Sequence, residues 1–227
     1  MVPERRQMKI YEIFVSLDGE VNAFHQGCIT TFIRLAGCNL RPGCTYCDTQ
    51  YAMDPDSGTE MPVGEIVAKV KELGGNKVTI TGGEPLMQAV ELFSLTKKLW
   101  HEHFKISVET NGTYLPIGCG VGSWVVDFKL PSSGNYDKMK HDIFVDLTKL
   151  DYVKFVIMDE NDYLTAIREK NYLQSIGCHA NFAFSPMFGP QATPINEIKH
   201  KLVEWLIRDK VFDAIVNVQI HKLLGVA

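Results

Sequence analysis

The stretch TTFIRLAGCNLRPGCTYCDT, residues 30–49, joins an apolar, β-branched run to a loop that carries three cysteines. The run has the composition of a β-strand, and Cys38, Cys44 and Cys47 follow where that strand should end. The other three cysteines, at positions 28, 119 and 178, are scattered along the chain. A chain of 227 residues does not need disulfide bridges for stability, so the three clustered thiols favour a metal site.

The composition around this loop is that of an ordinary globular domain. Lys and Arg number 23 and Asp and Glu 27, and the resulting formal charge of −4 argues against a broad basic surface for nucleic acid. Hydrophobic residues make up 45% of the chain, which is too many for a disordered protein. No apolar run approaches the roughly 20 residues of a membrane span, and the first residues lack the apolar segment of a signal peptide. We therefore expect a cytoplasmic protein without a membrane or nucleic-acid partner.

The rest of the chain alternates between short β-rich runs and amphipathic helical runs. No repeat or break in composition divides it, so we predict one domain over residues 1–227, with residues 1–8 as a flexible N-terminal extension. Strands are predicted over residues 9–15, 31–35, 77–81, 105–109, 124–127, 152–157, 178–184 and 214–220. Helices are predicted over residues 62–73, 87–103, 162–174 and 196–208.

This alternation predicts an α/β fold with a parallel sheet. Because there are fewer helices than strands, an open or partial barrel fits better than a complete eight-fold (β/α) barrel. In both architectures the reactive groups lie at the carboxyl ends of the strands, which is where the three-cysteine loop begins.

The cysteine loop favours an iron–sulfur cluster over structural zinc. A structural zinc site takes four protein ligands, and no second cysteine pair accompanies this loop. Three thiolates suit a [4Fe–4S] cluster that leaves one iron free to bind a small molecule. A non-catalytic zinc-binding module is the alternative from a different functional class.

A second motif strengthens the cluster interpretation. The sequence TGGEP, residues 81–85, follows the next predicted strand, and a three-cysteine loop followed by GGEP resembles the radical S-adenosylmethionine (SAM) enzymes. Five residues separate the first two cysteines here, in place of the three typical of those enzymes. A turn at residues 42–43 can absorb the two extra residues. Cys44 is consequently the least secure of the three ligands, and Cys28 is the possible substitute.

Further segments narrow the resemblance to one family, the 7-carboxy-7-deazaguanine synthases. These segments are EIFVSLDGE at 12–20, FIRLAGCNL at 32–40, CTYCDT at 44–49, VETNGT at 108–113 and QIHKLLGVA at 219–227. The resemblance runs from about residue 8 to the end of the chain. It implies a partial, modified (β/α)₆ TIM-like barrel of the radical SAM type, usually assembled as a homodimer.

The resemblance also implies the reaction. A lyase of this family converts 6-carboxy-5,6,7,8-tetrahydropterin into 7-carboxy-7-deazaguanine with loss of ammonia, on the route to queuosine and other 7-deazapurines. A 5′-deoxyadenosyl radical takes hydrogen from C6 of the pterin, the ring contracts, and no protein nucleophile is needed. The implied cofactors are the [4Fe–4S] cluster, SAM and Mg²⁺, and the implied reductant is a flavodoxin- or ferredoxin-type protein.

Residue roles follow from matched positions. The resemblance implies Cys38, Cys44 and Cys47 as the cluster ligands and Thr49 as the Mg²⁺ ligand. The implied SAM-binding residues are Tyr46, Asp48, Gly83, Glu84, Asp127, Phe128, Lys129 and Ser185. The implied substrate-binding residues are Leu17, Asp18, Gly19, Glu20, Arg34, Thr81, His221 and Ala227.

Some of these positions depart from the family pattern. Asp18 stands where relatives have Gln, and an ionised carboxylate accepts but does not donate hydrogen bonds. Residues 127–129 read Asp-Phe-Lys where relatives often read Ser-Pro-Lys, and Ser185 replaces a Gln. These changes put the side-chain contacts there in doubt, whereas backbone contacts can persist.

The substrate that the resemblance implies carries a carboxylate, and two residues are candidates to contact this substrate. Arg34 lies four residues before Cys38 and can bind a carboxylate with two parallel hydrogen bonds. Its alternative is an ion-paired strand residue. His221 is predicted at the end of the last strand, with the chain end at Ala227 folding over the site; its alternative is a structural histidine. A different radical SAM enzyme, such as a glycyl-radical activase, would need neither residue.

Overall fold

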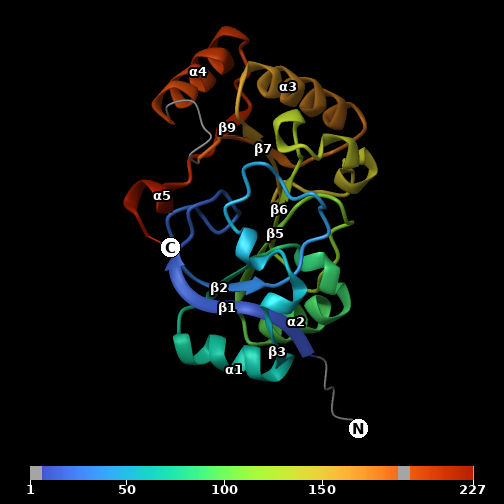
Figure 1. Cartoon of the computed structure of the whole chain (residues 1–227), viewed down its shortest axis with the longest axis vertical. Coiled ribbons are helices and arrows are strands. Elements are labelled where there is room, and N and C mark those ends of the chain that lie inside the picture. The colour runs from blue at the N-terminus through green and yellow to red at the C-terminus, as the bar shows by residue number, and fades with distance from the viewer. Residues whose placement is uncertain (1–6, 189–194, 227) are drawn as a thin grey trace.

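The computed structural model describes residues 7–188 and 195–226, and its strands form one mixed sheet (Figure 1). The strand order is β3-β1-β2-β4-β5-β6-β7-β8-β9. The strands are β1 (Gln7–Leu17), β2 (Ile29–Leu35), β3 (Thr59–Pro62), β4 (Lys77–Gly82), β5 (Lys105–Thr110), β6 (Ser123–Asp127), β7 (Tyr152–Ile157), β8 (Asn181–Pro186) and β9 (Ala214–Val216). The α-helices are α1 (Val63–Leu73), α2 (Ala89–His101), α3 (Glu160–Ser175), α4 (Ile195–Arg208) and α5 (Ile220–Leu224).

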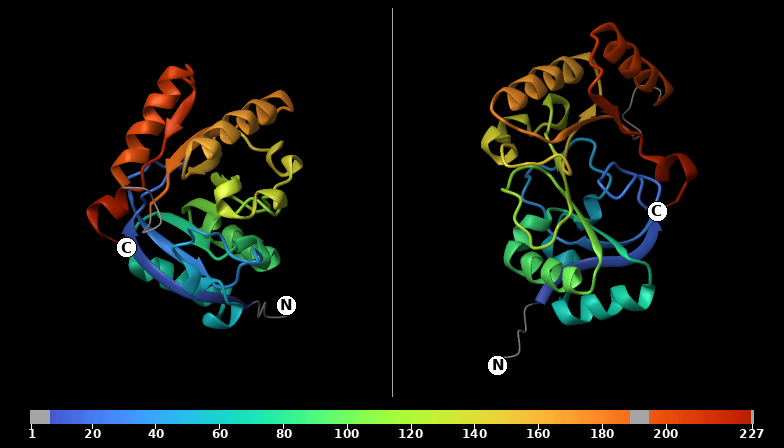
Figure 2. Two further views of the ribbon diagram at one scale, coloured as in Figure 1. Left: turned by 45° about the horizontal axis from the view of Figure 1, so that its top comes forward. Right: turned by 180° about the vertical axis from the view of Figure 1, so that it is seen from behind.

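The sheet is a curved, open barrel. From β2 to β9 every neighbouring pair is parallel, whereas β1 is antiparallel to both β2 and β3. The edge strands β3 and β9 do not pair with each other. Figure 2 shows the long helices around the outside of the curved sheet. This arrangement agrees with the predicted partial barrel and adds antiparallel strands at one edge.

The hydrophobic core lies between the sheet and the surrounding helices. Helix α2 buries Leu92, Leu95 and Leu99 in the same core as Ile80 of β4 and Ile106 of β5. A strand buried on both faces reads as a continuous apolar run, and β4 is buried from its first residue to its fifth. Packing against this core fixes the strand ends that carry the site.

Several element boundaries differ from prediction. The predicted extension over residues 1–8 is wrong at its end, because Gln7 begins β1 and Met8 is fully buried. Residues 1–6 lie outside the described residues. Strand β3 was not predicted, since it is four residues long and ends in a proline, features that suit only an edge strand.

The end of the chain differs most. Strand β9 ends at Val216, whereas the strand was predicted to continue to residue 220. It ends earlier because the Asn217 side chain bonds to Val21 and Ser185, and the chain then turns into α5. His221 therefore lies in the first turn of α5 and not at the end of a strand.

None of the helices in the described part of the chain combines the length and apolar character needed to cross a membrane.

Candidate functional site

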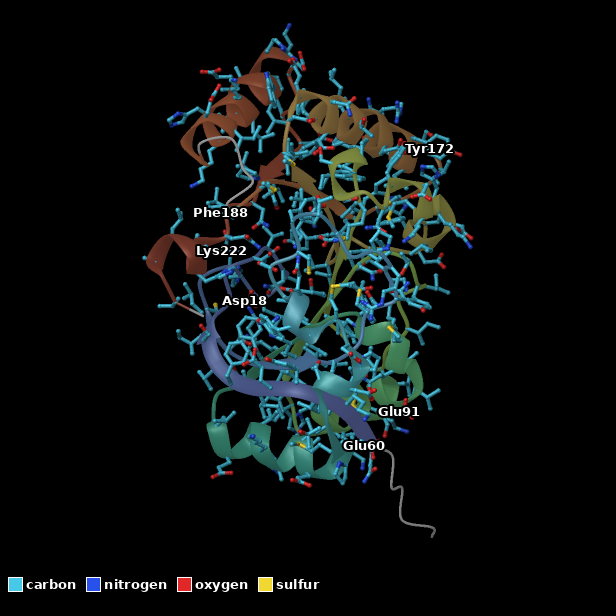
Figure 3. All side chains as sticks on the ribbon, viewed as in Figure 1. Asp18, Glu60, Glu91, Tyr172, Phe188 and Lys222 are labelled. Carbon is cyan, nitrogen blue, oxygen red and sulfur yellow. The ribbon has the colours of Figure 1, made fainter. Side chains whose placement is uncertain are left out.

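A cavity opens at the carboxyl ends of the parallel strands. The ends of β4, β5, β6, β7 and β8 all contribute to its wall, together with the three-cysteine loop after β2 and the segment after β1. Helix α5 closes one side. Figure 3 labels Asp18, Phe188 and Lys222, which line the cavity on that side.

Most of the predicted site residues line this one cavity. They are Leu17, Asp18, Gly19, Glu20, Arg34, Cys38, Cys44, Tyr46, Cys47, Asp48, Thr49, Thr81, Gly83, Asp127, Lys129, Ser185 and His221. Glu84 and Phe128 are not part of the lining. Ala227 lies outside the described residues.

Each thiol of the loop has a polar side chain beside it. Asn111 Nδ2 lies 3.8 Å from Cys38 Sγ, and Asn135 Nδ2 lies 3.7 Å from Cys44 Sγ. Thr49 Oγ1 lies 3.7 Å from Cys47 Sγ. Burial raises the pKa of the Cys38 and Cys44 thiols above the ordinary value, although the positive charge of nearby Lys129 opposes the rise.

The alternative ligand Cys28 lies elsewhere. It immediately precedes β2, at the opposite end of this strand from Cys38, and its Sγ lies 3.4 Å from the carbonyl oxygen of Phe24. It does not line the cavity. The structure thus removes Cys28 as a substitute for Cys44.

The three thiols of the loop face one cavity. Among the described residues, no three His, Cys, Asp or Glu side chains converge closely enough to hold a single metal ion. Thiolates that bind different irons of a [4Fe–4S] cluster need not converge on one point, so the arrangement is compatible with a cluster.

The two extra loop residues are accommodated at the surface. Leu40 is buried and anchors the loop, whereas Arg41 and Pro42 are exposed. The Arg41 guanidinium donates to the Met53 carbonyl oxygen at 2.9 Å, and Lys138 Nζ donates to the Arg41 carbonyl oxygen at 3.1 Å. The five-residue interval therefore leaves Cys44 facing the cavity.

The GGEP turn touches the cysteine loop through backbone atoms. The Glu84 amide donates to the Gly37 carbonyl oxygen at 2.7 Å. A Cβ on Gly83 would lie 2.1 Å from the same oxygen, so no larger residue fits there without a shift of the backbone. The missing side chain lets the two loops approach each other.

Glu84 occupies a different place from the one predicted. Its carboxylate is fully buried and accepts from Leu86 N at 2.9 Å, Thr110 Oγ1 at 2.8 Å and Asn111 N at 2.7 Å. Burial raises the pKa of Glu84 above the ordinary value, although these hydrogen bonds oppose the rise. Glu84 ties the GGEP turn to the end of β5, and its carboxylate does not line the cavity, which leaves its backbone as the group available to SAM.

The Phe128 side chain also lies outside the cavity lining. Asp127 and Lys129 face the cavity, and the residue between them points into the core. The centre of the Phe128 ring lies 5.2 Å from the centre of the Phe144 ring and 5.8 Å from that of the Phe155 ring. Alternation of side chains along an extended segment explains the difference.

A chain of buried charges crosses the cavity floor. Lys154 Nζ lies 2.5 Å from Glu20 Oε2 and 3.2 Å from Asp127 Oδ1, and Lys129 Nζ lies 2.5 Å from Asp127 Oδ2. Burial tends to raise the pKa of Asp127, but the two ammonium groups outweigh it and hold that pKa below its usual value. The site thus keeps paired charges away from bulk water.

Two buried polar atoms in this region have no hydrogen-bond partner among the described residues. One is Tyr46 Oη. The other is Asp127 Oδ1, which is ion-paired with Lys154 Nζ at 3.2 Å. Buried polar groups are normally satisfied, so Tyr46 Oη, which has neither a hydrogen bond nor an ion pair, points to a bound ligand.

Arg34 and Asp18 are already paired. Arg34 Nε donates to Glu12 Oε1 at 2.8 Å, so Arg34 is ion-paired on its strand, and it also lines the cavity. The buried Asp18 carboxylate lies 2.9 Å from Lys77 Nζ and accepts from Thr79 Oγ1 at 2.8 Å. Its carboxylate is therefore committed to the protein.

Helix α5 is bonded to both the loop after β1 and the cysteine loop. Gln219 Nε2 donates to Glu20 Oε1, and Lys222 Nζ lies 2.5 Å from Asp48 Oδ2. The His221 ring lies on Gly19, where a Cβ would sit 1.8 Å from Nδ1. Burial lowers the pKa of His221. The imidazole is therefore a neutral group within the site at pH 7.

Sequence reasoning missed several residues of the site. Glu109 and Asn111 lie in the VETNGT segment, which was noted for its resemblance to the family but not for its individual side chains. Lys77, Lys154 and Asn135 carry no local sequence signal, because only the fold brings them to the site.

Comparison with known proteins places these features in context. A family model described as the Radical SAM superfamily matches residues 32–117. The chain is 36% identical over 227 residues to 7-carboxy-7-deazaguanine synthase of Clostridium acetobutylicum, with 95% of both chains covered. It is 35% identical to the enzyme of the same name from Leptospira interrogans, with 95% of this chain and 94% of that one covered.

Two solved structures show the same fold. QueE from Escherichia coli matches with a TM-score of 0.73 and 22% identity, covering 94% of each chain. SuiB of Streptococcus suis, solved bound to S-adenosylmethionine, matches with a TM-score of 0.50 and 13% identity, covering 80% of this chain and 44% of that one.

Proposed function

The chain belongs to the 7-carboxy-7-deazaguanine synthase family of radical SAM enzymes, and on that premise we propose its substrate and the roles of its residues. It is a radical SAM lyase that acts on a small molecule in 7-deazapurine biosynthesis. The substrate is 6-carboxy-5,6,7,8-tetrahydropterin, and the product is 7-carboxy-7-deazaguanine with release of ammonia. The observation that carries the proposal is the cavity that joins three thiols, the GGEP turn and the ends of β1 and α5.

The residues present fit a [4Fe–4S] cluster and SAM. Three thiols line one cavity, the missing side chain of Gly83 lets the GGEP backbone approach the cysteine loop, and the buried Tyr46 Oη has no hydrogen-bond partner among the described residues. When bound, the cluster and SAM supply the reductive cleavage that starts radical chemistry.

The chain's own residues bind the cluster, orient SAM and shield the site from water. Cys38, Cys44 and Cys47 hold the cluster, and Lys129 places a positive charge beside Cys44. The backbone at Gly83 and the Asp127 carboxylate serve the SAM side of the cavity. Helix α5 keeps bulk water out, and a radical reaction needs such exclusion.

On the substrate side, Arg34 takes the carboxylate of the pterin. Its guanidinium is the part of the residue that can hold two oxygens at once, and Glu12 already fixes Nε. His221 contributes a neutral imidazole from α5, and Leu17 and Gly19 offer backbone groups from the segment after β1.

A magnesium ion at Thr49 forms part of the same proposal. A hydroxyl oxygen is a hard ligand that suits Mg²⁺, which would take its other ligands from substrate oxygens and water. Thr49 lines the cavity next to Cys47. We expect product formation to depend on Mg²⁺ and that dependence to weaken in Thr49→Val.

Three further points rest on the family resemblance and on the undivided composition. The chain acts as one domain, works as a homodimer and receives electrons from a flavodoxin- or ferredoxin-type protein.

An anaerobic turnover assay tests the proposal. The reconstituted protein is supplied with carboxytetrahydropterin, SAM, Mg²⁺ and a reductant, and the products are read by mass spectrometry. We expect 7-carboxy-7-deazaguanine from the wild type and from Cys119→Ala, and none from Cys47→Ala. A wild type with a fully loaded cluster and no product would overturn the assigned reaction.

A further inference from the structure

Two asparagine amides lie against the sulfurs of the cysteine loop and reach them from segments far away in the sequence. Asn111 follows β5, and its Nδ2 is 3.8 Å from Cys38 Sγ. Asn135 lies in the connection between β6 and β7, and its Nδ2 is 3.7 Å from Cys44 Sγ. Both distances suit a hydrogen bond to sulfur, a larger acceptor than oxygen.

The surroundings of Asn135 determine which way its amide points. Lys138 Nζ donates to Asn135 Oδ1 at 2.7 Å, and an ammonium group can only donate. The oxygen of the amide therefore faces Lys138, and the NH₂ group faces Cys44. The Asn135 backbone amide also donates to Ser133 Oγ at 3.0 Å, and the residue is fully buried, so the side chain is held in place.

The same reasoning orients Asn111. Its Oδ1 accepts from the Thr113 amide at 3.0 Å and from Thr113 Oγ1 at 2.6 Å. Its NH₂ group is left to donate to Asn39 Oδ1 at 2.8 Å and to Cys38. Two of the three ligand sulfurs thus face an amide whose direction is determined by independent contacts.

We propose that Asn135 and Asn111 are positioning residues that donate N–H groups to the ligand sulfurs and thereby raise the reduction potential of the cluster. The inference rests on the proposed function. Reduction adds one electron to the cluster and increases the negative charge on its sulfurs, and no covalent bond forms or breaks in the protein. A donor aimed at a ligand sulfur stabilises this reduced form, so its removal makes the potential more negative.

Asn135 offers the sharper test. It does not line the cavity, so it cannot act by touching SAM or the pterin directly, whereas Asn111 does line it. Asn135→Ala removes the donor. Asn135→Asp keeps the shape and the acceptor for Lys138 but replaces the NH₂ group with an oxygen and adds a negative charge, so its potential should fall at least as far as that of Asn135→Ala.

Asn181→Ala is the matched control. The Asn181 amide donates to the carbonyl oxygens of Lys149 and Asp151 at the amino end of β8, away from the thiols. All four proteins are reconstituted anaerobically, their iron is counted, and the midpoint potential is measured by a redox titration followed by electron paramagnetic resonance.

We expect full iron in all four proteins, a more negative potential in both Asn135 variants, and the wild-type potential in Asn181→Ala. An unchanged potential in fully loaded Asn135→Ala and Asn135→Asp would overturn the inference. So would loss of iron from both variants, since the residue would then serve cluster assembly. Loss of iron from Asn135→Ala alone would also overturn it, because the added charge of Asn135→Asp lowers the potential by itself. A wild type that binds no iron would instead refute the proposed function.

Discussion

Glu109 is a buried carboxyl group whose protonation depends strongly on its neighbours. Its carboxylate lies at the end of β5, accepts from Thr81 Oγ1 at 2.9 Å and lines the cavity. Burial and the nearby Glu20 carboxylate raise the pKa of Glu109 to about 8, against the opposing charge of Lys154. The folded protein therefore holds a proton at neutral pH that an unfolded chain releases.

This proton makes stability depend on pH. The contribution of Glu109 is fully present below the ordinary pKa of a glutamate and is lost as the pH rises through about 8, because the folded chain must then bury a charge. In the wild type, the unfolding free energy should fall between about pH 5 and 8.5 because of this proton. We expect Glu109→Gln to reduce the slope of unfolding free energy against pH by up to the amount that corresponds to one bound proton. Urea unfolding at a series of pH values measures it. Glu65→Gln, exposed on α1, is the control, and identical slopes in Glu109→Gln and wild type would contradict the expectation.

The choice between Cys44 and Cys28 is a second question at the scale of the residue. Of these two cysteines, only Cys44 lines the cavity. We expect Cys28→Ala to bind iron like the wild type after anaerobic reconstitution, and Cys44→Ala to lose most of its iron, since two thiolates hold a cluster poorly. Iron analysis with the visible absorption spectrum measures both. A Cys44→Ala protein that retained full iron would show that another residue supplies the ligand.

At this scale the sequence predicted which residues reach the site better than what each one does there. The cysteines and glycines of short motifs line the cavity as their local sequence suggested. The contacts of the Glu84 carboxylate were not predicted, because nothing in the motif shows that Thr110 and Asn111, at the end of another strand, satisfy it. Partners brought together only by the fold are invisible to local patterns.

At the scale of the element, the turn after β4 depends on close backbone contact. A Cβ on Gly83 would meet Gly37 O at 2.1 Å, whereas a Cβ on Gly64 in α1 would meet nothing within 4 Å. We expect Gly83→Ala to cost about 1–3 kcal/mol or more in stability and to weaken SAM binding. Gly64→Ala should stabilise the protein by up to about 1 kcal/mol, because alanine favours helix. Thermal unfolding and calorimetric titration with SAM measure the pair, and equal effects of the two substitutions would refute the contact.

The elements themselves were predictable where packing is uniform. Strands β4, β5 and β7 are buried on both faces, so their apolar runs mark them clearly. The segment after Val216 was mistaken for strand because Val218 and Ile220 continue an alternating pattern. Its course is set instead by side-chain contacts to the loop after β1, and α5 is too short to show a helical period.

At the scale of the whole molecule, side chains close the gap that the open sheet leaves. Asn217 Oδ1 accepts from the Val21 amide at 3.2 Å, and Gln26 Nε2 donates to the Val218 carbonyl oxygen at 2.8 Å. The Ile220 amide donates to the Gly19 carbonyl oxygen at 3.3 Å. The segment after β1 and the segment after β9 thus meet across the cavity rim without strand pairing.

Loss of Asn217 should open this closure. The residue is fully buried, and Asn217→Ala leaves several buried polar groups unsatisfied, for a cost of about 1–3 kcal/mol. We expect faster hydrogen exchange over residues 18–26 and 214–221, with little change in β4 to β7. Hydrogen exchange with mass spectrometry measures it, with the exposed Asn76→Ala as the control. Uniformly faster exchange over the whole sheet would show that Asn217 supports global rather than local stability.

The buried pair of Asp18 and Lys77 has a consequence for how this sequence can diverge. Each side chain is almost inaccessible, and the ammonium lies 2.9 Å from the carboxylate. A neutral amide at position 18 would leave the Lys77 charge buried without a counter-charge, a cost of roughly 3–5 kcal/mol. A substitution that removes the charge at only one of the two positions should therefore destabilise the protein. Among descendants of this chain, a change to Gln at position 18 should be inherited together with loss of the cation at position 77, as a single covarying unit.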